Sequence, residues 1–409
     1  MKKDRVVVTG LGVVSPIGTG ADAFWNAACK GVNGIAPITA FDTAGFRTSV
    51  GGEVKGFSPD VYLSPDQISS MGRSSQLAAS AAKMALAQAG IDITQQDPYR
   101  VGVSLGTTMG EPQILEQGIE MIYSARNSAS GLPADLPAKY PCGVISANVA
   151  RSIGACGPVI MIPTACAAGN YAIGYAFDLI STGVADLVIA GGSDPISKIA
   201  FTGFNRLLAT AKELCRPFDK NRDGMCVGEG AGALALESLT YAKNRGATIL
   251  AEVLGYGLGC DAFKMTIPDP SGSGGILALQ RALANAHLSP DQVDYISAHG
   301  TGTEENDKTE TLIIKAVFGE KARSIPVSSI KSMIGHTMGA ASAIEAVACV
   351  LMINREVILP TINYTEPDPE CDLDYVPNSA RNAAIGVAVS NAYAFGGNNS
   401  TLVLGKFGG

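Results

Sequence analysis

The stretch VIMIPTACAAGN, residues 159–170, has the form of a buried strand that ends where a helix begins. Four apolar residues end at Pro163. Small residues then begin an Ala- and Gly-rich segment that is typical of a tightly packed helix. Residues 325–348 repeat this order: a strand-like run leads to Lys331 and His336, and an Ala-rich helix follows. The parallel indicates a duplicated strand–helix unit with polar groups at both turns, although any α/β chain can produce such a likeness by coincidence.

Short apolar runs and Ala-rich stretches alternate over the whole chain, which predicts an α/β fold with mostly buried strands. Strands are expected at residues 5–8, 101–105, 159–162, 187–190, 233–237, 249–254, 295–298, 387–390 and 401–404. Helices are expected at residues 74–89, 169–181, 275–286, 308–317 and 340–354. A charged segment near residues 240–247 is the expected boundary between an N-terminal half, residues 1–246, and a C-terminal half, residues 247–409.

Composition favours a large, well-packed protein. The chain has 409 residues, of which 46% are hydrophobic and 16% charged, and this argues against disorder as a dominant state. The formal net charge of −7 disfavours general binding to nucleic acid or to an anionic membrane. The N-terminal residues lack a signal-peptide pattern, and no uninterrupted apolar stretch approaches about 18 residues, so we expect a cytoplasmic protein without a membrane span.

One cysteine has the setting of a nucleophile. The nine cysteines never lie closer than ten positions apart, which excludes paired zinc or redox motifs and favours reduced thiols. Cys166 stands directly after an expected strand, at the start of an expected helix. A thiol there feels the positive end of the helix dipole, so we expect a lowered pKa and amides able to stabilise an oxyanion. The alternative is a small buried apolar residue.

Two of the three histidines occupy glycine-rich turns. His287 closes an apolar helical pattern, where an interaction with the helix dipole is the simpler interpretation. His299 lies in AHGTGT after a strand, and His336 lies in GHTMG, turns of the kind that bind ligands in α/β folds. A structural hydrogen bond is the alternative for each. One thiol and two histidines fit a Cys–His peptidase or a thioester enzyme with two neutral enolate donors, and only the second accounts for both turns.

The other glycine-rich segments indicate no bound nucleotide or metal. GLGVVS at residues 10–15 lacks the third small residue of a dinucleotide fingerprint, and no Walker-type sequence, HExxH or acidic cluster occurs. The motif AFGGNN at residues 394–399 could bring backbone amides and an aromatic ring beside the thiol, or form a plain turn between two strands.

Six motifs in order resemble the β-ketoacyl-acyl-carrier-protein synthases, the elongating ketosynthases of type II fatty-acid and polyketide assembly. They are VVTGLGVVSP at 7–16, TACAAG at 164–169, the segment from RPFD to GEG at 216–230, AHGTGT at 298–303, SIKSMIGH at 329–336 and FGG at 395–397. The likeness runs from the first expected strand to the last. It implies a thiolase-type duplicated α/β fold in five layers, αβαβα, usually found as a dimer.

The resemblance also implies a reaction. An acyl chain passes from the 4'-phosphopantetheine arm of an acyl carrier protein to the cysteine, malonyl-carrier loses CO2, and the two condense to a β-ketoacyl-carrier. No cofactor is bound tightly in such a scheme. The implied roles are nucleophile for Cys166, enolate donors for His299 and His336, supporting residues for Lys331 and Glu345, oxyanion amides for Cys166 and Phe395, gate for Phe395, pantetheine contacts for Thr301 and Thr303, and acyl pocket for Met109 and Phe204.

Several positions depart from the family pattern. Ala394 stands where glycine often precedes the gating residue, and Glu304 stands where proline is common. Leu208 replaces an expected arginine, and residues 67–73 carry few basic side chains. Because such basic positions normally meet an acidic carrier, we expect an unusual carrier or docking surface and a specialised type II pathway. The remaining docking candidates are Arg73, Lys198 and Arg206.

Other interpretations stay open at the level of sequence. The chain could pair with itself or with a ketosynthase-like chain-length factor. It could be the non-catalytic partner itself, although Cys166, His299 and His336 are intact. A coenzyme A-dependent thiolase would use one histidine and a second cysteine near the C-terminus, and Cys371 is not in a comparable glycine-rich turn.

Overall fold

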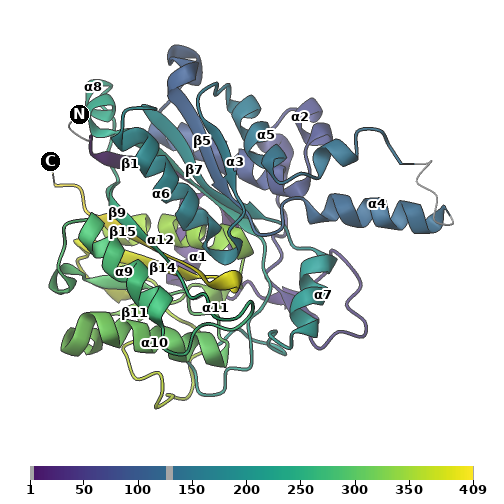
Figure 1. Cartoon of the computed structure of the whole chain (residues 1–409). Coiled ribbons are helices and arrows are strands. Elements are labelled where there is room, and N and C mark those ends of the chain that lie inside the picture. Colours follow the sequence, from purple (N-terminus) through teal and green to yellow (C-terminus); the bar gives the residue numbers. More distant parts are fainter. Residues whose placement is uncertain (1–3, 126–131, 409) are drawn as a thin grey trace.

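A computed structural model describes residues 4–125 and 132–408, and its centre is one mixed sheet of 11 strands (Figure 1). Ten strands follow the order β11-β10-β14-β15-β9-β1-β8-β7-β5-β6, and β2 pairs with β1. Their bounds are β1 Val6–Ser15, β2 Gly18–Thr19, β5 Val101–Gly106, β6 Val159–Ile162, β7 Leu187–Asp194, β8 Gly230–Ser238, β9 Ala251–Cys260, β10 Tyr295–Ser297, β11 Val327–Ser328, β14 Val387–Tyr393 and β15 Asn398–Gly405.

The sheet consists of two halves with the same topology. Strands β6-β5-β7-β8-β1 form one half-sheet and β11-β10-β14-β15-β9 the other. In each, the first three strands are parallel and the last two pairings are antiparallel. The halves join where β1 pairs with β9 between residues 6–8 and 251–253. The predicted duplication is confirmed, and β6 and β11, which precede the two polar turns, occupy equivalent positions.

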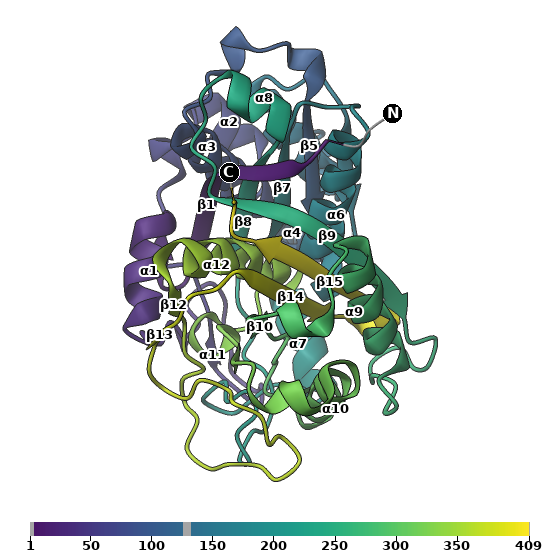
Figure 2. The same ribbon diagram turned by 90° about the vertical axis from the view of Figure 1, so that its left-hand side faces the viewer.

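Helices alternate with the two half-sheets in layers (Figure 2). Helix α3 covers the outer face of the N-terminal half-sheet, α6 and α12 pack together between the halves, and α9 and α10 cover the outer face of the C-terminal half-sheet. Their bounds are α3 Arg73–Ala89, α6 Ala168–Ser181, α9 Ser273–Asn285, α10 Glu304–Phe318 and α12 Ala341–Arg355. This is the five-layer αβαβα arrangement that the resemblance implied.

Small residues allow these layers to approach closely. A Cβ at Gly10 or Gly12 would lie 2.0 or 1.8 Å from a backbone oxygen of α3, so the glycines of β1 serve helix packing. Helix α12 is buried from Ala341 to Ile353. Residues 338–355 are apolar enough to resemble a membrane span, with a mean hydropathy of 1.3, but 89% of this segment is buried inside the fold. Its apolar character follows from its place between two sheets.

Every predicted strand and helix overlaps an observed one, and the differences lie in length and in missed elements. Strand β1 continues to Ser15 because it stays paired with β8 across an irregularity after Val8. The helices α1 Ala21–Cys29, α2 Pro65–Ser70, α4 Pro112–Ser124, α5 Gly143–Ile153, α7 Lys198–Arg206, α8 Leu239–Asn244 and α11 Lys331–Ile334 were not expected. Helix α4 buries only Pro112 within the chain and extends away from the body (Figure 1), so it lacks the buried face that marks a helix in a sequence.

Candidate active site

The nucleophile candidate lies in a tight turn between β6 and α6. Cys166 is the middle residue of a 3-10 turn, Ala165–Ala167, and α6 begins at the next residue. Ala165 has φ 51°, in the left-handed region that residues with a Cβ rarely adopt. A Cβ at Gly106 on β5 would lie 2.3 Å from the backbone of Ala168, so only glycine lets the start of α6 approach the sheet here. The local fold therefore holds the thiol at the carboxyl ends of the strands.

Burial dominates the electrostatics of this thiol. Cys166 is buried, and burial raises the pKa of its thiol to about 12, although the positive charge of Lys331 acts in the opposite direction. The expected lowering of the pKa by the helix terminus is therefore wrong for this closed pocket, because desolvation outweighs it. The backbone N–H groups of Cys166 and Phe395 favour the charged form of the sulfur. They are placed to receive negative charge that forms on an atom bound there.

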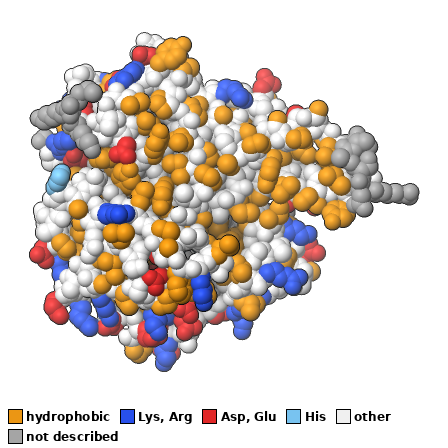
Figure 3. All heavy atoms as spheres, viewed as in Figure 1, with side chains coloured by type: hydrophobic (Ala, Val, Ile, Leu, Met, Phe, Trp, Pro, Cys, Tyr) orange, Lys and Arg blue, Asp and Glu red, His pale blue; other side chains and the backbone are white. Residues whose placement is uncertain are grey.

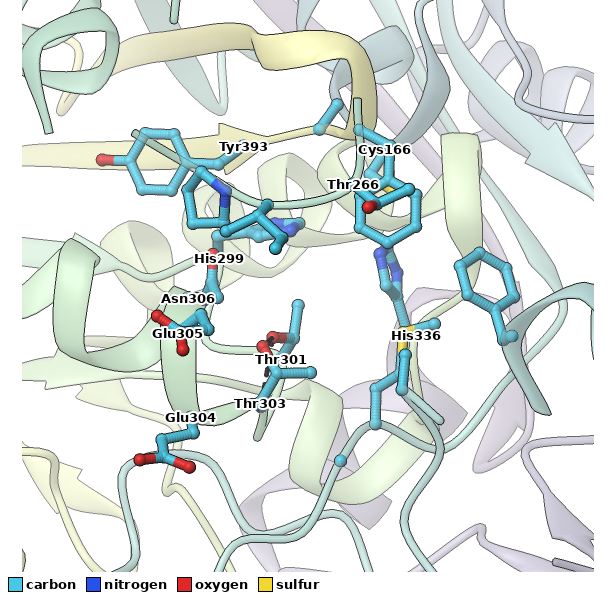
Figure 4. Close-up of a pocket in the computed structure, with 18 of the residues that line it drawn as sticks. Cys166, Thr266, His299, Thr301, Thr303, Glu304, Glu305, Asn306, His336 and Tyr393 are labelled. Carbon is cyan, nitrogen blue, oxygen red and sulfur yellow. Dashed lines mark hydrogen bonds between the residues drawn. The ribbon is translucent and has the colours of Figure 1, made fainter. Parts of the chain in front are cut away.

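His299 and His336 line the same cavity as Cys166, which has a volume of about 340 Å³ (Figure 4). Their ring centroids are 5.3 Å apart in an edge-to-face arrangement. Burial and, next, the charge of Lys331 place the pKa of both imidazoles well below the usual range, so both are neutral near pH 7. The N–H of Met338 donates to Nδ1 of His336 over 3.3 Å. A neutral His336 therefore carries its proton on Nε2, as a hydrogen-bond donor.

Lys331 and Glu345 form a fully buried ion pair behind the histidines. Lys331 begins α11 and Glu345 lies on α12, so the pair connects the His336 turn to the central helix layer. Burial raises the pKa of Glu345 to about 7, although Lys331 favours its charged form. Neither side chain lines the cavity. The pair acts on the site through charge and position.

Two carboxylates of α10 hold the turn that carries His299, and the sequence analysis missed both. Glu310 accepts hydrogen bonds from the backbone N–H groups of His299 and Gly300, each over 2.8 Å. Asp307 accepts from the N–H of Gly302 over 3.2 Å. Both carboxylates are fully buried, and their spacing of three residues puts them on one face of a helix. That spacing, directly after a histidine turn, is the signal that could have revealed them.

Thr301 and Thr303 lie on this turn and line the cavity (Figure 4). Their hydroxyl oxygens are 2.9 Å apart, and the N–H of Thr303 donates to the hydroxyl of Thr301 over 3.3 Å. The pair therefore presents hydroxyl groups along the path from the surface to the histidines.

Phe395 begins a 3-10 turn, Phe395–Gly397, whose backbone is tied to a neighbouring loop. The N–H of Gly396 donates to the carbonyl of Met265 over 2.7 Å. Ala394 has extended backbone angles, φ −124° and ψ 154°, so alanine in place of glycine causes no backbone strain. The ring of Phe204 lies 5.8 Å from that of Phe395, and both line the cavity.

Met109 does not line the described cavity, unlike Phe204. Its backbone N–H donates to Asp194, which also accepts from Thr107, from the N–H of Thr108 and from the N–H of Gly339. Asp194 is fully buried, and burial raises its carboxyl pKa to about 6. This unpredicted carboxylate connects the Met109 segment to the turn that carries the second histidine.

The three predicted docking cations have different surroundings. The guanidinium of Arg73 makes a two-pronged ion pair with Glu229, at 2.6 and 2.7 Å, so it is engaged within the chain. Lys198 and Arg206, at opposite ends of α7, are exposed. Among the described residues, neither cation forms an ion pair. A docking role stays a prediction for these two.

Comparison with known proteins places the whole chain among condensing enzymes. Residues 3–242 match the model of the beta-ketoacyl synthase N-terminal domain, and residues 250–365 match that of the C-terminal domain. The 3-oxoacyl-[acyl-carrier-protein] synthase 2 of Staphylococcus aureus strain COL is 41% identical over 409 residues, which cover 98% of both chains. The structure of the ishigamide ketosynthase/chain length factor is also 41% identical, with a TM-score of 0.95 over 99% of this chain and 100% of that one. A type II polyketide ketosynthase in complex with its acyl-carrier protein, AntDE:AntF, is 36% identical, with a TM-score of 0.92 over 99% of this chain and 100% of that one.

Proposed function

The chain belongs to the β-ketoacyl synthase family of condensing acyltransferases, and we propose that Cys166 carries its acyl chain while His299 and His336 serve decarboxylation. The observation that carries this proposal is that one cavity contains the thiol, two neutral imidazoles and the Phe395 turn.

The first half-reaction is acyl transfer to the thiol. The sulfur of Cys166 attacks the carbonyl carbon of an acyl thioester on the carrier's phosphopantetheine, and the carbonyl oxygen becomes an oxyanion. The N–H groups of Cys166 and Phe395 are placed to stabilise it. The intermediate collapses to an acyl-cysteine, and the carrier leaves as a thiol with the proton lost by Cys166. A thiol pKa of about 12 keeps the resting nucleophile protonated.

The second half-reaction begins with decarboxylation of malonyl-carrier. The bond between the carboxylate and the α-carbon breaks, CO2 leaves, and the electron pair forms an enolate on the thioester. Two neutral imidazoles that donate to the enolate oxygen stabilise this charge without first transferring a proton. Nε2 of His336 is the defined donor of the pair.

Condensation follows from the same placement. The α-carbon of the enolate attacks the carbonyl carbon of the acyl-cysteine, and the new oxyanion again faces the two amides. Its collapse releases the thiolate of Cys166 and forms the β-ketoacyl-carrier. The pantetheine arm would reach the site along Thr301 and Thr303, and the acyl chain would pass Phe204. Met109 stays a proposed pocket residue, although it does not line the described cavity.

The structure also bears on the alternative functions. A non-catalytic partner has no need for an intact thiol beside two neutral histidines, so that role is disfavoured. A coenzyme A-dependent thiolase would need a second cysteine at the site, whereas Cys166 is the one cysteine among the described residues that line the cavity. The condensing reaction accounts for both histidines and for their neutral state.

Assembly with a second ketosynthase-like chain is part of the proposal. The sheet ends at β6, whose outer edge pairs with no strand among the described residues, and Val159 at its start is 42% exposed. Helix α4 also exposes Leu115, Ile119, Met121 and Tyr123, and apolar side chains cover the projecting arm in Figure 3. A second copy or a chain-length factor would cover these surfaces.

We further propose a cytoplasmic location, because all nine cysteines are free thiols.

Mass spectrometry of the intact protein tests the proposed nucleophile. The wild-type chain is mixed with acyl-carriers of different chain lengths, and an acyl adduct on the protein is expected. Cys166→Ala should give no adduct, whereas Cys260→Ala, which removes an exposed thiol, should retain it. An adduct of equal yield on the Cys166→Ala protein would show that another residue carries the chain.

A further inference from the structure

Three exposed apolar side chains surround the mouth of the catalytic cavity. Leu208 is 68% exposed, Met265 79% and Ile267 39%, and all three line the cavity that ends at Cys166. We call these three residues the mouth patch. Leu208 and the loop of Met265 and Ile267 come from different halves of the chain, so the patch exists only in the folded protein.

Leu208 occupies a backbone position that disfavours leucine. It follows the C-terminal residue of α7 and its cap, and it has φ 56°. Its N–H donates to the carbonyl of Asn205, and the N–H of Ala209 donates to that of Phe204, which closes the end of the helix. Glycine or asparagine is usual at such a left-handed position because a branched side chain strains the backbone. A leucine with a strained backbone and an exposed side chain does not stabilise the fold of the isolated chain.

The charges around the mouth are mixed. Lys264, Glu304 and Glu305 line the cavity and are exposed, and Figure 4 shows Glu304 on the side of the cavity away from Cys166. None of the three forms an ion pair among residues 4–125 and 132–408. The two glutamates begin α10, where the helix dipole favours them. The exposed Asp223 also lines the cavity but pairs with Arg47, so one unpaired cation stands beside two unpaired anions and cannot attract an acidic partner strongly.

We propose that the acyl carrier protein docks on the mouth patch through apolar contacts, with electrostatic attraction as a minor contribution. This inference rests on the proposed function, since the carrier is the partner whose arm must enter the cavity toward Cys166. The carrier that fits has an apolar surface beside its pantetheine-bearing serine. Arg206 and Lys198 on α7 lie outside the cavity lining and contribute at the periphery.

Leu208→Asn tests the patch directly, because asparagine tolerates a left-handed backbone but is polar. We expect kcat/KM for acyl transfer from acyl-carrier to fall about tenfold, as for the loss of one leucine from a buried contact. Transfer from acyl-pantetheine, which passes Leu208 but has no protein to dock, should fall less than transfer from acyl-carrier. Leu208→Gly should give the same kinetic result and an unchanged or higher melting temperature, since it relieves the backbone strain.

Two controls separate apolar docking from electrostatic docking. Leu312→Asn, on the surface of α10 with 41% exposure, should leave both reactions unchanged. Arg206→Gln should reduce the carrier reaction less than Leu208→Asn does. For the wild type, KM for the carrier should change less than about threefold between low and physiological salt, because apolar contacts are not screened.

Three results would overturn the proposal. One is an undiminished carrier reaction in Leu208→Asn, and another is a greater loss in Arg206→Gln with a steep dependence on salt. The third is that neither acyl-carrier nor acyl-pantetheine acylates the wild-type thiol. That last result would reject the proposed function itself, whereas the first two would leave it standing and reject only the docking surface.

Discussion

At the scale of single residues, the decisive feature is that burial, aided by the buried charge of Lys331, keeps two histidines neutral. Lys331 lowers the pKa of His299 and His336 in addition to the effect of burial. Neutrality matters for His336 because its Nδ1 already accepts the N–H of Met338. A second proton on the ring would place two N–H groups against each other and remove this hydrogen bond.

Removing the Lys331 charge should therefore move the pH dependence of decarboxylation. The double variant Lys331→Met/Glu345→Gln avoids leaving a buried carboxylate without its partner. Because Lys331 lowers both histidine pKa values, its loss raises them, so protonation begins at higher pH. The acid limb of the rate of CO2 release from malonyl-carrier should shift to higher pH than in the wild type. Coincident acid limbs would show that the ion pair does not control the histidines.

His336→Ala should separate the two half-reactions. Loss of one donor to a developing oxyanion typically slows a reaction by about 10²–10³-fold, and we expect that loss in CO2 release from malonyl-carrier. Acylation of Cys166 should remain within about tenfold of the wild-type rate, because its oxyanion faces backbone amides. His287→Ala, at an exposed site after α9, is the control. Equal loss of both half-reactions in His336→Ala would assign this residue to structure or to acyl transfer.

At the scale of elements, the site depends on turns that helices hold in place. Helix α10 fixes the His299 turn through Glu310 and Asp307, and Asp194 at the end of β7 joins the Met109 segment to Gly339. The long strands and the helices α3, α6, α9, α10 and α12 follow from the sequence, because apolar periodicity reports burial on one side. The network around Asp194 could not be predicted, since its partners lie 85 to 145 residues away along the chain.

Glu310→Gln tests the support of the His299 turn. An amide can accept only one of the two backbone hydrogen bonds, and its NH2 group would face the other N–H. Such a buried mismatch costs about 1–3 kcal/mol. We expect a lower melting temperature and slower CO2 release, with acylation of Cys166 less affected. Leu312→Gln, an exposed change on the same helix outside the cavity lining, should alter neither melting nor decarboxylation. A wild-type rate of CO2 release in Glu310→Gln would show that Glu310 does not support the His299 turn during decarboxylation.

At the scale of the molecule, duplication explains why the catalytic groups meet. The equivalent strands β6 and β11 deliver Cys166 and His336 to one cavity, and the helices that follow them, α6 and α12, pack together between the half-sheets. That Cys166, His299 and His336 share one cavity could be predicted, because these scarce residue types stand at strand ends, and the fold could be predicted from the family resemblance. The direction of the thiol pKa could not, since desolvation depends on atoms that the whole fold brings around Cys166.

The unpaired edge of β6 gives a prediction at the same scale. Val159→Lys places a charge on that edge, which natural sheets use to prevent strand pairing. Light scattering should show a shift from dimer toward monomer, whether the partner is a second copy or a coexpressed chain-length factor. Leu312→Lys, with 41% exposure against 42% for Val159, is the matched control and should not change the mass. An unchanged dimer in Val159→Lys would place the interface elsewhere.

The most direct test of the central claim is to weigh the carrier-bound product of a complete reaction. The wild-type chain is first acylated by an acyl-carrier, malonyl-carrier is added, and both protein and carrier are analysed by mass spectrometry. We predict that the adduct on Cys166 disappears as a β-ketoacyl-carrier two carbons longer appears, with release of CO2. Cys166→Ala should form neither adduct nor product. A persistent adduct without chain extension, in the presence of a competent partner subunit, would contradict the assignment of this cavity as a condensing site.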